Sequence, residues 1–89
     1  MENTILNTEE IGKRIREIIY SNGENYVSVA KELNITPQGL SKWGAGRTIP
    51  DIQNATNFCK HFNITLDYLM LGEEEKNQGE YPLYENNER

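Results

Sequence analysis

Three groups of residues in this chain resemble parts of catalytic or nucleotide-binding motifs, but none of these motifs is complete. Cys59 and His61 could form a thiol nucleophile and its base, but residues two apart on a helix project about 200° away from each other. Ser28 and Lys31 match the S-x-x-K pattern of β-lactam-reactive enzymes without its companion motifs. The segment Gly44-Ala45-Gly46 begins like a nucleotide-binding loop, but it follows no strand and lacks the third glycine. We therefore expect no enzymatic activity.

The single cysteine and the single histidine limit the covalent and metal chemistry of the chain. One cysteine cannot form an internal disulfide, and one cysteine with one histidine cannot complete a structural zinc site. We expect Cys59 to be an inert residue of the core and His61 to lie partly exposed near the end of a helix. The chain is accordingly expected to hold no metal and no cofactor.

The length and the charge distribution indicate one small domain followed by an acidic tail. The chain has 89 residues, which suits a single compact domain, and its net charge is −5. Through Gly72 seven basic residues nearly balance eight acidic ones, whereas residues 73–89 carry two basic and six acidic residues. The composition of that tail favours disorder. We therefore expect an N-terminal arm at 1–7, a globular domain at 8–72 and a flexible acidic tail at 73–89.

The sequence contains no sign of a membrane segment or a secretion signal. Residues 1–7 have neither a basic run nor an apolar stretch, and no later segment approaches the roughly 18 consecutive apolar residues of a membrane span. The expected location is cytoplasmic, with no membrane partner.

Apolar residues recur at helical spacing along the whole domain, which predicts an all-α fold of five helices. Each helix should begin at a side chain that accepts a hydrogen bond from the first turn, and a proline suits the first position of the third helix. The expected N-caps are Thr8, Asn25, Thr36, Asp51 and Thr65, and the expected helix ends include Asn22-Gly23 and Gly72. The expected buried residues are Ile11, Ile15, Ile18, Ile19, Tyr26, Val29, Ala30, Leu33, Leu40, Trp43, Ile52, Ala55, Phe58, Cys59, Phe62, Leu66, Leu69 and Met70.

The same four-residue pattern occurs at two places between expected helices. Leu33-Asn34-Ile35-Thr36 and Phe62-Asn63-Ile64-Thr65 each combine an apolar residue, an Asn that tolerates the left-handed conformation, a buried Ile and a capping Thr. Each pattern predicts a three-residue turn between two helices.

The second and third expected helices, with the short turn between them, form a helix-turn-helix pattern in which Ala30 allows close approach. On these residues the chain resembles the lambda-repressor-like family, the Cro and CI type of phage and bacterial regulators. The segments that carry the resemblance are Ile11-Gly12-Lys13-Arg14-Ile15-Arg16, Val29-Ala30-Lys31-Glu32-Leu33, Leu40-Ser41-Lys42-Trp43, Gly46, Pro50-Asp51 and Leu66-Asp67-Tyr68-Leu69-Met70-Leu71-Gly72. The resemblance implies a five-helix DNA-binding domain.

The chain departs from the family pattern at three positions. Family members usually have Glu after the Trp, where this chain has Gly44, and Gly in the turn, where it has Asn34. Tyr26 stands where they commonly have a Gln that often touches a phosphate. We expect the fold to tolerate all three changes.

The resemblance implies that the third helix enters the major groove of DNA, whose width admits a helix. The outward positions expected to meet base edges are Pro37, Gln38, Ser41 and Lys42. Gln can pair with two atoms of adenine and Lys can donate to guanine, so Gln38 and Lys42 are the expected direct readers. Ser41 is expected to serve a base or a phosphate.

The remaining site residues are expected to position the DNA backbone or to hold the motif together. The expected phosphate contacts are Arg47, Thr48, Asn25, Tyr26 and Thr36. The expected structural core of the motif is Ala30, Leu33, Ile35, Leu40 and Trp43.

The function that these features imply is sequence-specific regulation of transcription. We expect a repressor of phage, plasmid or bacterial type that binds a double-stranded operator as a homodimer. The sequence does not identify the dimer surface, for which the candidates are the fifth helix and the tail, where Tyr81-Pro82-Leu83-Tyr84 forms an apolar island. An alternative from another class is a protein-interaction module, such as an antitoxin-like protein that binds its partner through the acidic tail.

Overall fold

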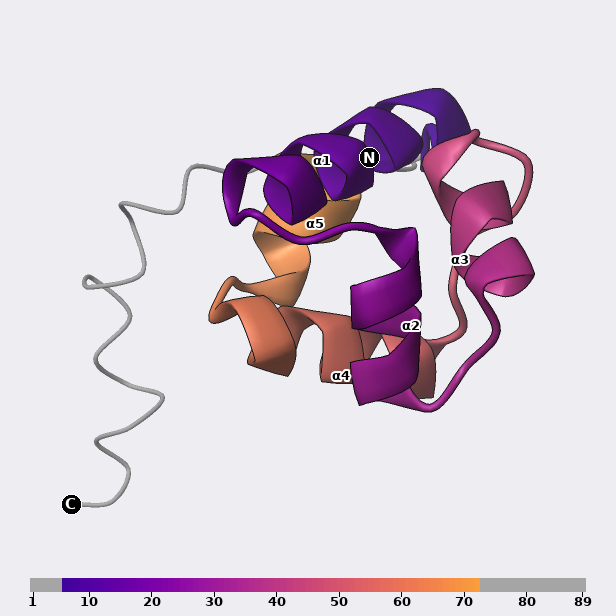
Figure 1. The fold of residues 1–89 in the computed structure, drawn as a ribbon. Coiled ribbons are helices and arrows are strands. Elements are labelled where there is room, and N and C mark those ends of the chain that lie inside the picture. Colours follow the sequence, from indigo (N-terminus) through magenta and orange to yellow (C-terminus); the bar gives the residue numbers. More distant parts are fainter. Residues whose placement is uncertain (1–5, 73–89) are drawn as a thin grey trace, which may run out of the picture.

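The computed structural model describes residues 6–72, which form five α-helices and contain no strand (Figure 1). The helices are α1 (Thr8–Ser21), α2 (Tyr26–Leu33), α3 (Pro37–Gly44), α4 (Ile52–Phe62) and α5 (Leu66–Leu71). The predicted all-α fold of five helices is therefore confirmed. Most of the predicted arm at 1–7 and all of the predicted tail at 73–89, including its apolar island, lie outside the described residues.

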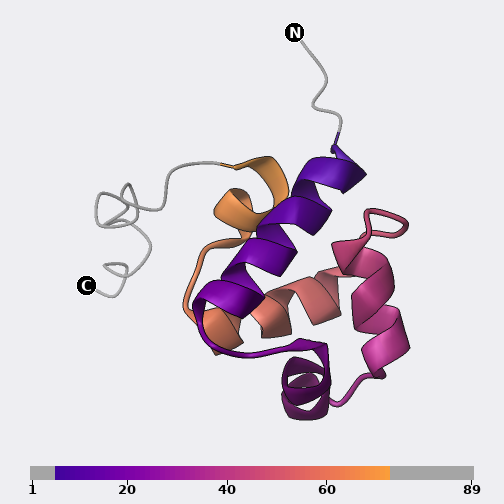
Figure 2. The same cartoon turned by 45° about the horizontal axis from the view of Figure 1, so that its top comes forward.

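The helices enclose a single core (Figures 1 and 2). In Figure 2, α1 crosses the front of the domain between α5 and α3, and it contacts both. α2 packs against α3 and against α4, and α4 packs against α5. This arrangement brings α2 and α3 together at one end of the domain, which is the right-hand end in Figure 1.

The core consists of apolar side chains from all five helices. Ile15 and Ile19 of α1, Phe58 of α4 and Leu69 of α5 have no exposed surface. The other buried apolar residues are Ile11, Ile18, Val29, Ala30, Leu40, Trp43, Ala55 and Cys59. Five further predicted core residues pack half-buried against this cluster: Tyr26, Leu33, Phe62, Leu66 and Met70. No polar or charged side chain is buried within residues 6–72, so the interior of the domain is held by apolar contacts.

One predicted core residue lies on the surface instead. Ile52 is 69% exposed, whereas Ala55 and Phe58 on the same helix are buried. Ile52 has the spacing of the apolar face, but it is the first residue of α4, and its side chain stays outside the core that Ala55 and Phe58 enter. Its burial depends on where the neighbouring elements end, and periodicity along one helix does not contain that information.

The predicted N-caps of α2 to α5 are confirmed. Asn25, Thr36, Asp51 and Thr65 each accept a hydrogen bond from the backbone N–H three residues further on. The predicted cap of α1 is wrong by one residue, because Asn7 Oδ1 accepts the hydrogen bond from Glu10 N at 3.0 Å. Asn is a better N-cap than Thr, so the helix begins one residue after Asn7.

Both predicted left-handed turns are confirmed. Asn34 and Asn63 have φ values of 60° and 59°. In each turn the N–H of the following Ile donates to the carbonyl five residues before it, Ala30 or Cys59, at 3.0 Å. These bonds satisfy carbonyls at the helix end and fix the direction in which the chain leaves the helix.

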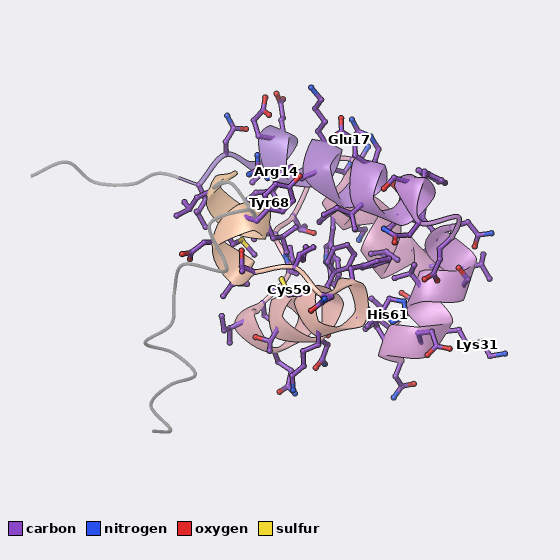
Figure 3. The ribbon with its side chains drawn as sticks, turned by 90° about the vertical axis from the view of Figure 1, so that its left-hand side faces the viewer. Arg14, Glu17, Lys31, Cys59, His61 and Tyr68 are labelled. Atoms are coloured by element: carbon purple, nitrogen blue, oxygen red, sulfur yellow. The ribbon has the colours of Figure 1, made fainter. Side chains whose placement is uncertain are left out.

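Cys59 and His61 leave α4 in different directions, as their spacing predicts (Figure 3). Cys59 is 6% exposed and belongs to the core. His61 Nε2 lies 2.9 Å from Glu24 Oε2, and the other oxygen of Glu24 accepts a hydrogen bond from Ser28 Oγ at 3.1 Å. His61 therefore connects α4 to the turn that precedes α2.

Candidate nucleic-acid interface

α2, the turn at Asn34 and α3 form the helix-turn-helix unit. Ala30, Leu40 and Trp43 are buried between these helices and α1, as predicted for the core of the motif. Leu33 and Ile35 are half-buried and pack against the same cluster. Apolar contacts on the inner side of the unit thus fix the orientation of its outer face.

The outer face of α3 carries the four predicted base-reading side chains. Pro37, Gln38, Ser41 and Lys42 are all exposed, while Leu40 between them is fully buried. Gln38 and Lys42 are four residues apart, so they lie on the same face of the helix. Within residues 6–72, the side chains of Gln38, Ser41 and Lys42 have no hydrogen-bond or ion-pair partner. Their donors and acceptors are therefore available to a ligand.

The start of α2 and the start of α3 place polar side chains beside this face. Asn25 and Ser28 form a capping box, in which Asn25 Oδ1 accepts from Ser28 N at 2.8 Å and Ser28 Oγ accepts from Asn25 N at 3.1 Å. Thr36 Oγ1 accepts from Gly39 N at 3.0 Å. The caps use only the acceptor atoms, so the Asn25 amide N–H groups and the Thr36 hydroxyl proton can still donate.

Arg47 and Thr48 stand at the other end of α3, and both are exposed. Gly46 adopts a φ of 78°, and the N–H of Arg47 donates to the Lys42 carbonyl at 2.9 Å. This glycine turn ends α3 and directs Arg47 to the surface. Two groups of candidate phosphate contacts therefore flank the base-reading face, one on each side.

Tyr26 is placed differently from the other candidate phosphate contacts. An ideal Cβ atom on Gly44 would lie only 2.0 Å from the Tyr26 hydroxyl oxygen. The Tyr26 ring also lies 6.0 Å, between centroids, from the ring of Tyr20. Burial raises the pKa of the Tyr26 hydroxyl, Tyr20 adds to the rise, and Arg16 opposes it. Tyr26 therefore joins the start of α2 to the end of α3, and its contact with a phosphate stays a prediction.

Two contacts that support the interface could not be predicted from the sequence patterns. The Arg16 guanidinium donates to the Gly44 carbonyl, which ties α1 to the end of α3. A Cβ atom on Gly12 would lie 2.7 Å from the Trp43 carbonyl oxygen and 2.8 Å from the Gly44 carbonyl oxygen. α1 thus approaches the backbone at the end of α3 closely, and a glycine inside an apolar helical stripe is the signal that could have indicated this approach.

Arg14 has a structural role that its charge does not suggest (Figure 3). Its Nε donates to the Leu69 carbonyl at 2.9 Å, and its Nη2 donates to the Met70 carbonyl at 3.2 Å. These carbonyls belong to the last turn of α5, where no helical partner is available. One basic residue of α1 is therefore used for capping α5.

The described residues were compared with the requirements of a metal site and of a membrane-spanning helix. Within 6–72 no group of three or more His, Cys, Asp or Glu side chains could hold a metal ion. No helix among these residues is long and apolar enough to cross a membrane.

The fold and the exposed α3 are those of a helix-turn-helix protein, and the chain belongs to this family. The family model described as "Helix-turn-helix" matches residues 25–69, which run from the cap of α2 into α5. This match confirms the resemblance to lambda-repressor-like regulators.

Two curated relatives are named as regulators of transcription. The chain is 25% identical over 65 residues to the HTH-type transcriptional activator BcrR of Enterococcus faecalis, over 73% of this chain and 32% of that protein. It is 30% identical over 61 residues to the SPbeta prophage-derived uncharacterized HTH-type transcriptional regulator YonR of Bacillus subtilis (strain 168), over 68% of this chain and 56% of that protein. The matched region thus covers about a third of one relative and just over half of the other. No solved structure gives a significant match.

Proposed function

We propose that this protein is a transcriptional regulator that binds double-stranded DNA sequence-specifically, with α3 in the major groove. The observation that carries the proposal is the row of exposed side chains Gln38, Ser41 and Lys42 on a helix whose opposite face is fully buried. Family membership and two relatives named as transcriptional regulators support it.

Each side chain of the row matches a group that DNA presents. Gln38 can pair with N6 and N7 of adenine, and Lys42 can donate to O6 and N7 of guanine. Ser41 can donate to either a base or a phosphate. Pro37, at the first position of α3, can contribute apolar contact only, because it has no N–H.

The phosphate contacts fit on both sides of the same row. Arg47 and Thr48 lie in the loop after α3, and Asn25 and Thr36 lie at the caps of α2 and α3. Such contacts fix the register of a protein on the duplex and carry no sequence information themselves. With Arg47 and Lys42 as the cations of this face, we expect binding to weaken with salt.

We further propose that the protein acts as a homodimer and represses transcription. One helix-turn-helix unit reads few base pairs, and a two-fold dimer on half-sites one helical turn apart doubles the number that is read. A helix-turn-helix domain bound across a promoter would occlude it, which is the simplest way in which DNA binding by this domain could act on transcription.

Selection of bound duplexes from a random DNA pool tests the proposal directly. We expect enrichment of a two-fold symmetric sequence, and binding to it that is tighter than binding to a scrambled duplex and weaker at high salt. Sedimentation of the complex should give two chains per duplex. Absence of any duplex preference would reject DNA recognition and favour the alternative, a protein-interaction module.

A further inference from the structure

A neutral hollow of about 420 Å³ lies between α2 and α3, beside the predicted base-reading row. Tyr26 and Val27 line it from α2, and Pro37, Gln38 and Ser41 line it from α3. Three of these residues, Pro37, Gln38 and Ser41, are themselves predicted to meet base edges, whereas Val27 is not. The hollow therefore opens on the face that the proposed function turns toward DNA.

Val27 leaves an aliphatic side chain uncovered in this hollow. Its side chain is 65% exposed, although Val29 two residues later is fully buried. Pro37, the other aliphatic side chain of the lining, is also exposed. Together they give the hollow an apolar floor that the core of the domain does not use.

The charge of the lining indicates which part of a duplex would fit. No charged side chain lines this hollow, whereas a second hollow of similar size, near the end of α4, is lined by Glu32, Lys60 and His61 among others. A phosphate would be expected to attract a basic side chain, and none is present in the lining. The C5-methyl of thymine is the apolar group that base pairs present in the major groove.

We infer that Val27 and Pro37 form an apolar contact for a thymine methyl group, which makes Val27 a specificity-determining residue on α2. The inference rests on the proposed function. Gln38 borders the hollow, so this thymine belongs to the base pair that Gln38 reads or to its neighbour. Recognition would then combine hydrogen bonding by Gln38 with a methyl contact that needs residues of both α2 and α3.

The test replaces each thymine of the selected duplex in turn by deoxyuridine, which removes only the methyl group. For the unchanged protein, one position per half-site should weaken binding about fourfold, as expected for one buried methyl group. Val27→Ala should bind the thymine duplex more weakly, and replacement of thymine by deoxyuridine at that one position should no longer weaken its binding. Because Val27 is mostly exposed, the variant should fold normally, which thermal unfolding can verify.

Ile52→Ala is the matched control, since Ile52 is also an exposed aliphatic residue, at the start of α4. The ratio of its affinity for the thymine duplex to its affinity for the deoxyuridine duplex should equal that of the unchanged protein, whatever its absolute affinity. A selected site without thymine, or equal affinity for every deoxyuridine duplex, would overturn the inference while leaving the proposed function standing. If Val27→Ala weakens binding but no methyl group matters, the hollow contacts deoxyribose, and the thymine assignment is wrong. If the protein shows no duplex preference at all, the proposed function fails and the inference falls with it.

Discussion

The hydroxyl oxygen of Tyr26 stands 2.0 Å from the point where a Cβ atom on Gly44 would be. The two positions are the start of α2 and the last residue of α3, and both depart from the usual family residues, Gln and Glu. The bulky ring at one position fits because the other has no side chain. Two departures that look independent in the sequence are therefore one packing arrangement.

Gly44→Ala should lower the free energy of unfolding by about 1 kcal/mol or less, below the usual cost of overpacking a core, because the atoms in the way are the outer end of the half-buried Tyr26 side chain, which can move. Gly44 is helical and has no positive φ, so an alanine at a helix position without Tyr26 would be neutral or stabilising. In a Tyr26→Gln background the same change should cost far less. Urea unfolding of the two single variants and the double variant measures this coupling.

Gly12→Ala provides the control for this comparison of single and double variants. The atoms that crowd a Cβ at Gly12 are backbone atoms of Trp43, Gly44 and Gly46, which cannot rotate away. Gly12→Ala should therefore destabilise the domain equally in the unchanged protein and in the Tyr26→Gln background. Additive effects of Tyr26→Gln and Gly44→Ala would contradict the assigned packing.

Arg14→Met should destabilise the domain by about 1–3 kcal/mol, because two carbonyls at the end of α5 lose charged donors. Lys13→Met removes the same charge from an exposed neighbour and should change stability by less than about 0.5 kcal/mol. Amide exchange should also accelerate in α5 of the Arg14 variant alone. Equal effects of the two variants would show that charge, and not capping, is responsible.

Trp43→Ala should cost about 3–5 kcal/mol, a large share of the stability of so small a domain. Trp43 is 7% exposed and packs in the core, so the loss should appear in thermal unfolding without DNA. An unchanged midpoint with impaired DNA binding would place this side chain on the binding face instead.

Features that depend on a few neighbouring residues could be predicted from the sequence. The caps at Asn25, Thr36, Asp51 and Thr65 and the left-handed turns at Asn34 and Asn63 follow from local hydrogen bonding and backbone preference. The burial of the isoleucines of α1 follows from their spacing.

Features that depend on how helices meet could not be predicted in this way. The exposure of Ile52, the use of Arg14 as a cap for α5 and the pairing of Tyr26 with Gly44 each involve elements distant in sequence. The exposed row of α3 was predictable because a single helix defines it. The hollow beside Val27 was not, because two helices form it.

Comparison of Gln38→Ala with Arg47→Ala separates base reading by α3 from phosphate binding by the loop that follows it. Both side chains are exposed, so neither change should unfold the domain. Lys60→Ala, an exposed cation on α4, controls for the general loss of positive charge.

The measurement is the affinity of each variant for the selected duplex and for a scrambled duplex over a range of salt concentrations. Gln38→Ala should lose about 1–3 kcal/mol of discrimination with an unchanged salt dependence. Arg47→Ala should weaken both duplexes by similar factors and make the salt slope shallower by about one unit per subunit. Equal weakening of binding to both duplexes by Gln38→Ala, or weakening of binding to the selected duplex alone by Arg47→Ala, would contradict these roles of α3 and of the loop.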